Sequence, residues 1–304
     1  MRPGLLKWIY LFVLAIIWGS SFILMKRGLV YFRADQVAAI RMTVAFVAIF
    51  PFVARHYASI PKDRFKYLAV VGLIGSGIPA ILFSTAQTHI NSTLAGMLNS
   101  LTPVFTLLIG FFFFRTRFTI WQSAGVALGF IGAAGLVLLN TEGAISADYK
   151  YALLIVIATA MYGISVNTIK AHLGAINSFV ITGFALLFAA VPYGIYLFCT
   201  DFLHRIQEVP GAWTGFGYIA TLALFGTALS SVFYFHLVKI ANPLFASVVT
   251  YFIPIVAMMW GLGDGEGLNF WHIPAMLSIL SGVAMISYGS YRTRKNSEKE
   301  AAKG

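Results

Sequence analysis

Few polar side chains in this 304-residue chain lie where they could do chemistry, and Arg41 is the most unusual of them. It lies about two helical turns inside a long apolar run, where a guanidinium group needs an ionic partner or an aqueous cavity. It could hold a substrate carboxylate through paired hydrogen bonds. It could also pair structurally with Asp35 or with a carbonyl at a helix end. The sequence leaves both interpretations open.

Two lysines and two prolines occupy matching positions in the halves of the chain. Lys26 and Lys170 end the first and sixth apolar runs. They either gate the two mouths of a cavity, by attracting anions or closing ion pairs, or only extend toward lipid headgroups. Pro103 and Pro254 lie in the fourth and ninth runs, where proline kinks a helix. These kinks are either hinges or static bends, so all four residues are candidate gating residues.

Hydrogen-bonding and aromatic side chains suited to a small polar solute gather mainly in the third and fourth runs. If the third helix continued far enough, Ser84, Thr88 and Asn91 would share one of its faces. His89 and His236 are candidate proton sites, or hydrogen-bonded structural histidines. The predicted substrate-binding residues are Trp18, Arg41, Phe83, Ser84, Gln87, Thr88, Asn99, Tyr162, Asn167, Tyr234 and Tyr251.

The composition identifies the solvent around these residues as lipid. The chain is 59% apolar and 10% charged, whereas soluble domains carry roughly 25% charged residues. Backbone groups in lipid must be paired internally, and long continuous apolar runs favour helices over the alternating strands of a barrel. The sequence therefore predicts an all-α membrane protein.

Several functional classes are excluded by what the sequence lacks. The net charge of +11 is spread over short segments between apolar runs, which is typical of topology signals and not of nucleic-acid binding. The single Cys199 excludes an internal disulfide and a cysteine-based zinc site. The acidic turn at 263–267 has too few ligands for a calcium loop. We expect no metal, no cofactor and no enzymatic activity.

Ten runs are long enough to span a bilayer core, which takes roughly 20 residues. Lysine and arginine are concentrated in the segments that lie inside when the N-terminus is cytoplasmic. This predicts a multi-pass inner-membrane protein with both termini in the cytoplasm. The runs lie near 5–25, 35–55, 67–88, 92–114, 118–139, 150–170, 176–199, 212–238, 243–262 and 271–291.

The two halves of the chain resemble each other. Trp18 matches Tyr162 at an offset of 144, and Gly75 matches Gly226 at an offset of 151. A five-span unit has an odd number of crossings, so a second copy must insert upside down. Inverted repeats of this kind place a substrate site where the copies meet. We predict one repeat over 1–140, a second over 146–292 and a polar cytoplasmic tail over 293–304.

Several features of the chain resemble the EamA family of the drug/metabolite transporter superfamily. They are the segment 18–22 with the Lys26 that ends its helix, Arg41 in the second run, and the two segments that run from Asn to Pro. The resemblance covers about residues 5–292. It implies a ten-helix inverted-repeat carrier of an inner membrane, which often exports amino acids or related metabolites. It also implies that the third, fourth, eighth and ninth helices line the cavity, while the fifth and tenth pack peripherally.

We therefore expect a secondary transporter of small metabolites that works by alternating access. Amino acids or related solutes moved outward are favoured. No acidic residue lies near a span centre, which favours uniport or exchange over proton antiport through a carboxylate. Alternatives are a carrier of drugs or of anionic or phosphorylated metabolites, a non-transport receptor and an intramembrane enzyme. The expected partners are a small-molecule substrate and the bilayer, and the choice between monomer and dimer stays open.

Overall fold

The computed structural model describes residues 3–56, 60–114, 119–138, 148–240, 249–267 and 270–301, and these ranges contain helices but no β-strand. The predicted all-α class is therefore confirmed. The first half contains α1 (Pro3–Leu29), α2 (Ala34–His56), η2 (Lys62–Arg64), α3 (Phe65–Gly72), η3 (Leu73–Gly77), α4 (Ile78–Ala86), α5 (Ser92–Asn99), α6 (Thr102–Phe114) and α7 (Ile120–Leu138). The second contains α8 (Asp148–Thr168), η4 (Ile169–Leu173), α9 (Ser178–Phe198), α10 (Phe202–Glu208), α11 (Ala212–Thr221), η5 (Leu222–Leu229), α12 (Ser230–Ile240), α14 (Val249–Gly263) and α15 (His272–Ala301).

Eight helical segments of the described residues are long and apolar enough to cross a membrane. The expected fifth and ninth spans correspond to two shorter apolar helices, Ile120–Leu136 and Phe252–Gly263. The segments next to these helices, 139–147 and 241–248, lie outside the described residues. The expected polar tail is helical as far as Ala301, because α15 continues through it.

Three of the expected spans are interrupted rather than continuous. A π-helical segment divides the third span at η3 and another divides the eighth at η5, around the matched glycines Gly75 and Gly226. Such wider turns are rare and are frequent at functional sites. The fourth span breaks between α5 and α6, so that Pro103 lies in the first turn of α6 instead of inside a helix.

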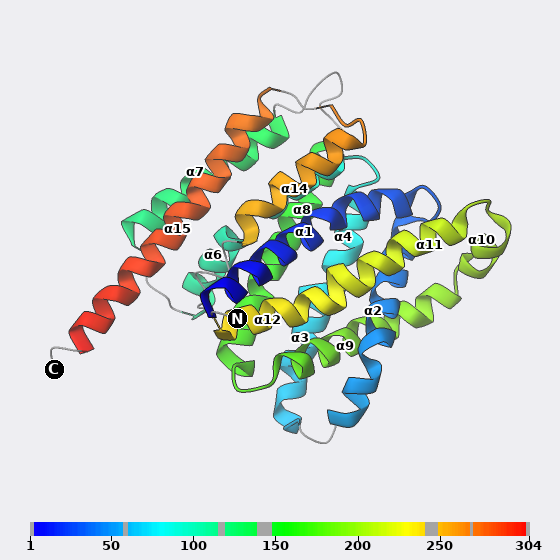
Figure 1. Ribbon diagram of the computed structural model, residues 1–304, viewed down its shortest axis with the longest axis horizontal. Helices are drawn as coiled ribbons and strands as arrows, with labels where there is room; N and C mark the ends of the chain where they lie inside the picture. Colours follow the sequence, from blue (N-terminus) through cyan, green and yellow to red (C-terminus); the bar gives the residue numbers. More distant parts are fainter. Residues whose placement is uncertain are drawn as a thin grey trace.

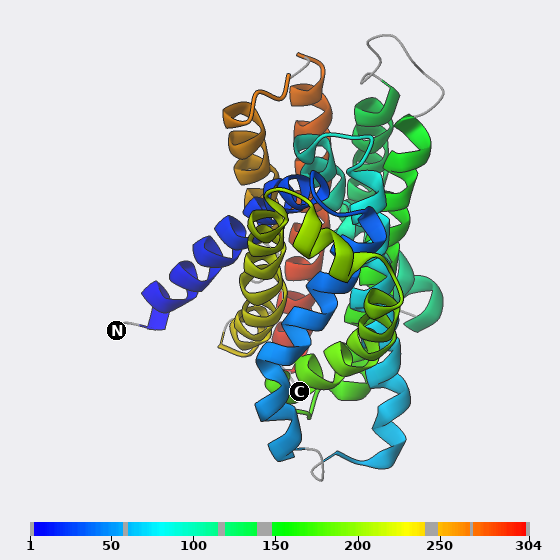
Figure 2. The same cartoon turned by 90° about the vertical axis from the view of Figure 1, so that its right-hand side faces the viewer.

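The helices pack in pairs that join the two halves of the chain. The closest pairs are α1 with α14, α8 with α6, α2 with α9, and α7 with α15. Figure 1 shows α7 and α15 side by side at one edge, and in Figure 2 the N-terminal part of α1 slants away from the bundle. The α7–α15 pair is tight because Gly125 faces the carbonyl of Gly282 and Gly132 faces the carbonyl of Ala275.

The third helix does not continue as far as a shared face of Ser84, Thr88 and Asn91 requires. Helix α4 ends at Ala86, and Thr88 and His89 follow in an exposed turn. Asn91 instead caps α5, since its side-chain oxygen accepts a hydrogen bond from the backbone N–H of Leu94 at 2.8 Å. Ser84, Thr88 and Asn91 therefore do not share a helical face.

Candidate substrate cavity and gate

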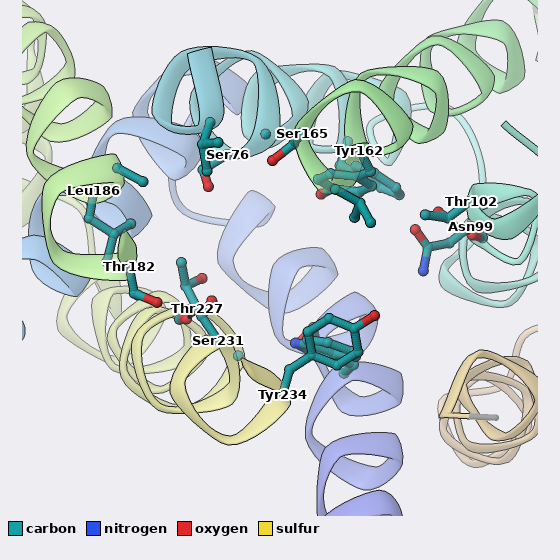
Figure 3. A pocket seen from close by; sticks show the side chains of 18 of the residues that line it. Ser76, Asn99, Thr102, Tyr162, Ser165, Thr182, Leu186, Thr227, Ser231 and Tyr234 are labelled. Carbon is teal, nitrogen blue, oxygen red and sulfur yellow. Dashed lines mark hydrogen bonds between the residues drawn. The ribbon is translucent and has the colours of Figure 1, made fainter. Parts of the chain in front are cut away.

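A cavity of about 260 Å³ lies at the centre of the bundle, where helices of both halves meet. Figure 3 shows side chains from facing helices pointing into it. Residues of the first to fourth and the sixth to ninth spans line it. The family resemblance implies a lining from the third, fourth, eighth and ninth spans, and the structure adds the first, second, sixth and seventh. The described residues of α7 and α15 contribute nothing to it, in line with their peripheral packing.

Arg41 of α2 lines this cavity and lies beside Thr227 of η5. Its Nε donates a hydrogen bond to Thr227 Oγ1 at 2.9 Å. Asp35, the structural partner considered from the sequence, instead pairs with Arg33 at 2.8 Å and accepts a hydrogen bond from the Tyr196 hydroxyl at 2.5 Å. The guanidinium has several further N–H donors. Thr227 holds the group in place while these donors can serve a ligand.

Among the described lining residues Arg41 is the only one with a formal charge at neutral pH. Carboxylates whose partners the structure describes lie in loops and at helix ends. Their ion pairs are Arg33–Asp35, Arg64–Asp63, Arg205–Asp201, Lys26–Asp264, Arg27–Asp264 and Lys26–Glu266. The cavity thus presents one cation to a ligand with no acidic side chain nearby to balance it.

Four aromatic rings form two contacting pairs on the cavity wall, one tilted and one stacked. In each pair, a ring of one half contacts a ring of the other half, and the two pairs use matched positions. Trp18 lies 5.2 Å from Tyr234, and Tyr162 lies 6.1 Å from Phe83, measured between ring centroids. Trp18 matches Tyr162 at offset 144, and Phe83 matches Tyr234 at offset 151. Each half therefore places its first-helix ring on the other half's third-helix ring.

The same exchange occurs between two glycines and two serines. A methyl group on Gly226 would lie 2.7 Å from Ser21 Oγ, and one on Gly75 would collide with the side chain of Ser165. Ser21 matches Ser165, and Gly75 matches Gly226. The absence of a side chain at each glycine lets the first helix of one half approach the π-helical segment of the other. The ring pairs and the glycine–serine contacts thus both join the first helix of one half to the third span of the other half.

We call one end of the bundle the Lys26 end. Five residues there form what we call the Lys26 cluster, namely Lys26, Ser92, Thr93, Asp264 and Glu266. The Lys26 ammonium lies 2.7 Å from both Asp264 and Glu266. The Glu266 carboxylate also accepts hydrogen bonds from the backbone N–H and hydroxyl groups of Ser92 and Thr93, at 2.6 to 3.0 Å. It thereby binds the N-terminus of α5, where unpaired N–H groups favour an anion.

The turn after α14 presents Glu266 to this helix. Gly265 has φ of +80°, a conformation that favours glycine and reverses the chain. Although burial by itself raises the pKa of Glu266, hydrogen bonds from Lys26, Ser92 and Thr93 lower that pKa to about 2. The carboxylate is therefore ionised in this arrangement throughout the physiological pH range.

The opposite end, where Lys170 lies, is built differently. Lys170 is exposed in η4, and no described carboxylate lies within ion-pair distance of it. The halves meet there through the Arg64 guanidinium, which donates to the His172 carbonyl at 2.7 Å. Tyr67 stacks on the His172 ring at 3.9 Å between centroids. The two ends of the bundle are thus closed by different chemistry.

The structure places the predicted substrate-binding residues in three groups. Ser84 and Gln87 are buried outside the cavity lining, Thr88 is exposed in the turn after α4, and Asn167 donates to backbone carbonyls of Thr106 and Gly163. The side chain of Tyr251 lies outside the described residues. The residues that line the cavity are Trp18, Arg41, Phe83, Asn99, Tyr162 and Tyr234.

The remaining candidates are also placed. His89 is exposed, stacks on Tyr151 at 3.6 Å between centroids and contacts Thr88 Oγ1, away from the cavity. The side chain of His236 is outside the described residues, although its backbone belongs to α12. Pro254 lies inside α14.

Several residues that line the cavity were not predicted from the sequence. Among the residues it did not single out as binding residues are Ser76, Ser165, Thr182 and Thr227, which all line the cavity. Ser76 and Thr227 directly follow the matched glycines at the same offset of 151, which could have identified them. The sequence predicts an ordinary loop over 263–267, whereas Asp264 and Glu266 of this segment pair with Lys26. Acidic residues are scarce in this chain, and that scarcity is the sequence signal that could have singled these two out.

Helices of this length and apolarity around an internal cavity define a multi-pass membrane protein. The model of the EamA-like transporter family matches residues 6–138 and 149–288, which is most of the chain. The chain belongs to this family, which confirms the resemblance seen in the sequence.

Relatives with curated names point to transport. The "Uncharacterized inner membrane transporter YedA" of Escherichia coli K12 is 26% identical over 294 residues, 92% of this chain and 90% of that one. A "Probable amino-acid metabolite efflux pump" of Salmonella typhimurium is 34% identical over 133 residues, 43% of this chain and 42% of that one. A solved crystal structure shares the fold with a TM-score of 0.60 at 15% identity, over 94% of this chain and 97% of that chain.

Proposed function

We propose that this protein is a secondary transporter that exports amino acids or related small carboxylates across an inner membrane. The observation that carries this proposal is the central cavity with the Arg41 guanidinium in its wall. Arginine binds carboxylates through two parallel hydrogen bonds. The printed names of two partial relatives, an "amino-acid metabolite efflux pump" and a "terminal-alkyne amino-acid exporter", agree with this substrate class.

Alternating access is the proposed mechanism. The exchanged contacts of matched residues support two inverted repeats that meet at the cavity, over 1–140 and 146–292. Rocking of one repeat bundle against the other would expose the cavity to each side in turn. The distribution of lysine and arginine favours cytoplasmic termini, so the Lys26 end would face outward and the Lys170 end inward.

Gating by the Lys26 cluster follows from this orientation. Lys26, Asp264 and Glu266 join α1, the turn after α14 and the start of α5. These elements must separate for the cavity to open outward at this end. The cluster would therefore hold the outer gate shut until substrate binding shifts the equilibrium.

Radiolabelled flux in proteoliposomes tests the proposal. Purified protein is reconstituted, and uptake of an amino-acid and organic-acid panel is measured with and without a pH gradient. We expect saturable flux of at least one carboxylate that does not depend on the gradient, because the described lining has no carboxylate to carry a proton. Absence of saturable flux for every solute in the panel would contradict the proposal.

A further inference from the structure

We propose that the cavity selects organic anions, namely carboxylates with an apolar body and no ammonium group, over zwitterionic amino acids of the same shape. This inference rests on the proposed transport function and narrows its substrate class. Four arguments support it. Three concern the site, namely its charge, its hydroxyl groups and its aromatic wall, and the fourth concerns the energy source that an anion would use.

The charge balance of the cavity is the first argument. Arg41 contributes one positive charge to the lining, and Ala185 occupies the matching position of the second half. A bound monocarboxylate brings the net charge of the site to zero. A bound amino acid brings a carboxylate and an ammonium group, so one positive charge stays uncompensated. An uncompensated charge is costly away from bulk water.

The hydroxyl groups of the cavity wall are the second argument. Thr227 Oγ1 accepts from the guanidinium, which fixes the direction of the remaining donors. Thr182 is 4% exposed, lines the same cavity and has a hydroxyl oxygen with no hydrogen-bond partner. Figure 3 shows Thr182 and Thr227 on facing helices. A hydroxyl or carbonyl oxygen on the body of the substrate would give Thr182 the partner that a buried polar group requires.

The aromatic wall supplies a place for the apolar body. The ring pairs Trp18–Tyr234 and Phe83–Tyr162 line the same cavity as the guanidinium. A cavity of about 260 Å³ is slightly below the roughly 300–1,000 Å³ of pockets for drug-sized ligands, so it suits a small metabolite. A carboxylate at Arg41 with a ring or branched chain against this wall satisfies both regions at once.

The energy source for export is the fourth argument. Cells hold their interior at a negative potential, which drives an anion outward without any coupled ion. At 100 mV this potential sustains a concentration ratio of about 50-fold for a single charge. A carrier of anions therefore needs no proton-binding carboxylate, in agreement with a described lining that has none. A zwitterion gains nothing from the potential.

The test compares two solutes that differ in charge but hardly in shape. In 3-phenyllactate a hydroxyl group replaces the ammonium group of phenylalanine. Uptake of each is measured at pH 7.5 in proteoliposomes of the full chain, with the rate in protein-free vesicles subtracted. We expect kcat/KM to be at least about tenfold higher for phenyllactate. An inside-positive potassium diffusion potential should increase phenyllactate accumulation and leave phenylalanine unchanged.

Variants at Arg41 locate the selectivity. Arg41→Gln removes the cavity charge and should bring the ratio of the two kcat/KM values close to one. Arg41→Lys keeps the charge and should retain the preference for phenyllactate. If Arg41→Gln does not fold, the wild-type comparison alone still decides the question.

The outcomes separate this inference from the transport function. Equal or faster flux of phenylalanine would overturn the selectivity for anions and leave the carrier in place. Phenyllactate flux that ignores the potential would overturn the proposed energy source. If neither of these two solutes moves while a zwitterionic amino acid of the panel does, the anion class is wrong but the transport function stands. If no solute moves, both proposals are contradicted.

Discussion

The ammonium group of Lys26 lies 2.7 Å from the carboxylate of Glu266, although 240 residues separate them in the chain. The same carboxylate binds the first N–H groups of α5. One side chain thus ties together three elements at the Lys26 end. Removing the charge of Glu266 is therefore the most direct test of gating.

Replacing Glu266 by Gln should open the Lys26 end. The amide keeps the shape of the side chain but loses the ionic component of its bonds to Lys26, Ser92 and Thr93. Charge-assisted hydrogen bonds contribute about 1.5–3 kcal/mol each, and Lys26 is partly exposed, so we expect a net shift of about one order of magnitude.

Thiol labelling from the Lys26 side measures this shift. A cavity cysteine, Ser231→Cys, is placed in a Cys199→Ser background and treated with a membrane-impermeant reagent. Labelling should be roughly tenfold faster with Glu266→Gln. The control is Asp201→Asn, which removes an ion pair with Arg205 outside the cavity. Equal labelling of the Glu266→Gln variant and its parent would exclude a gating role for this carboxylate.

The Lys26 cluster should not respond to pH near neutrality. The pKa of Glu266 is lowered from 4.5 to about 2, so its stabilising effect is complete above pH 4.5. That effect is lost only as pH falls from about 4.5 toward 2, since protonation then removes the charge. Flux of a fully ionised substrate should be constant from pH 5.5 to 8. A midpoint near pH 6.5 would assign the response to a histidine instead.

The glycine–serine contacts should show specific rescue. Gly226→Ala puts a methyl group 2.7 Å from Ser21 Oγ, and overpacking of this kind costs about 1–3 kcal/mol. Ser21→Ala removes that oxygen. The tightest contact left for the methyl group is Leu222 Cδ1 at 2.9 Å, the far end of a flexible side chain, so the double variant should recover most of the lost thermal stability. Gly75→Ala also meets the Ser165 Cβ, at 2.5 Å. Ser165→Ala should therefore fail to rescue it.

Melting temperatures in detergent measure both cycles, with Gly217→Ala as the control. Nothing lies within 4 Å of a methyl group at Gly217, which is in α11, so alanine should be neutral or stabilising by up to about 1 kcal/mol. Additive effects in the Gly226–Ser21 cycle would contradict the proposed contact.

Asn167 and Asn99 should separate a structural role from a binding role. Asn167 Nδ2 donates to the Thr106 carbonyl at 2.8 Å and to the Gly163 carbonyl at 2.9 Å, and it lies outside the cavity lining. Asn167→Leu should lower stability by about 1–3 kcal/mol and leave KM unchanged. Asn99 lines the cavity, so Asn99→Leu should raise KM with a smaller loss of stability. The reverse pattern would exchange the two assignments.

The sequence by itself determined the solvent, the class and the family of this protein. A low charged fraction and long apolar runs leave lipid as the only solvent that the surface can face, and lipid requires helices. The matched positions Trp18 and Tyr162 could be found by spacing alone. Arg41 could be identified as a candidate site residue because a guanidinium inside an apolar run has a high cost that some contact must offset.

The tertiary structure decided which side chains meet. Hydropathy and spacing do not specify the rotation of a helix in a bundle whose other face is lipid, so Asn167 and Asn99 looked equivalent until packing separated them. Helix α4 ends at Ala86, and Asn91 belongs to the next helix, α5, as its cap. Glu266 lies in a loop, and only the folding of distant helices brings a loop carboxylate to Lys26. The contact between Lys26 and Glu266, 240 residues apart, depends on how the two halves pack, and no local sequence pattern predicts that packing.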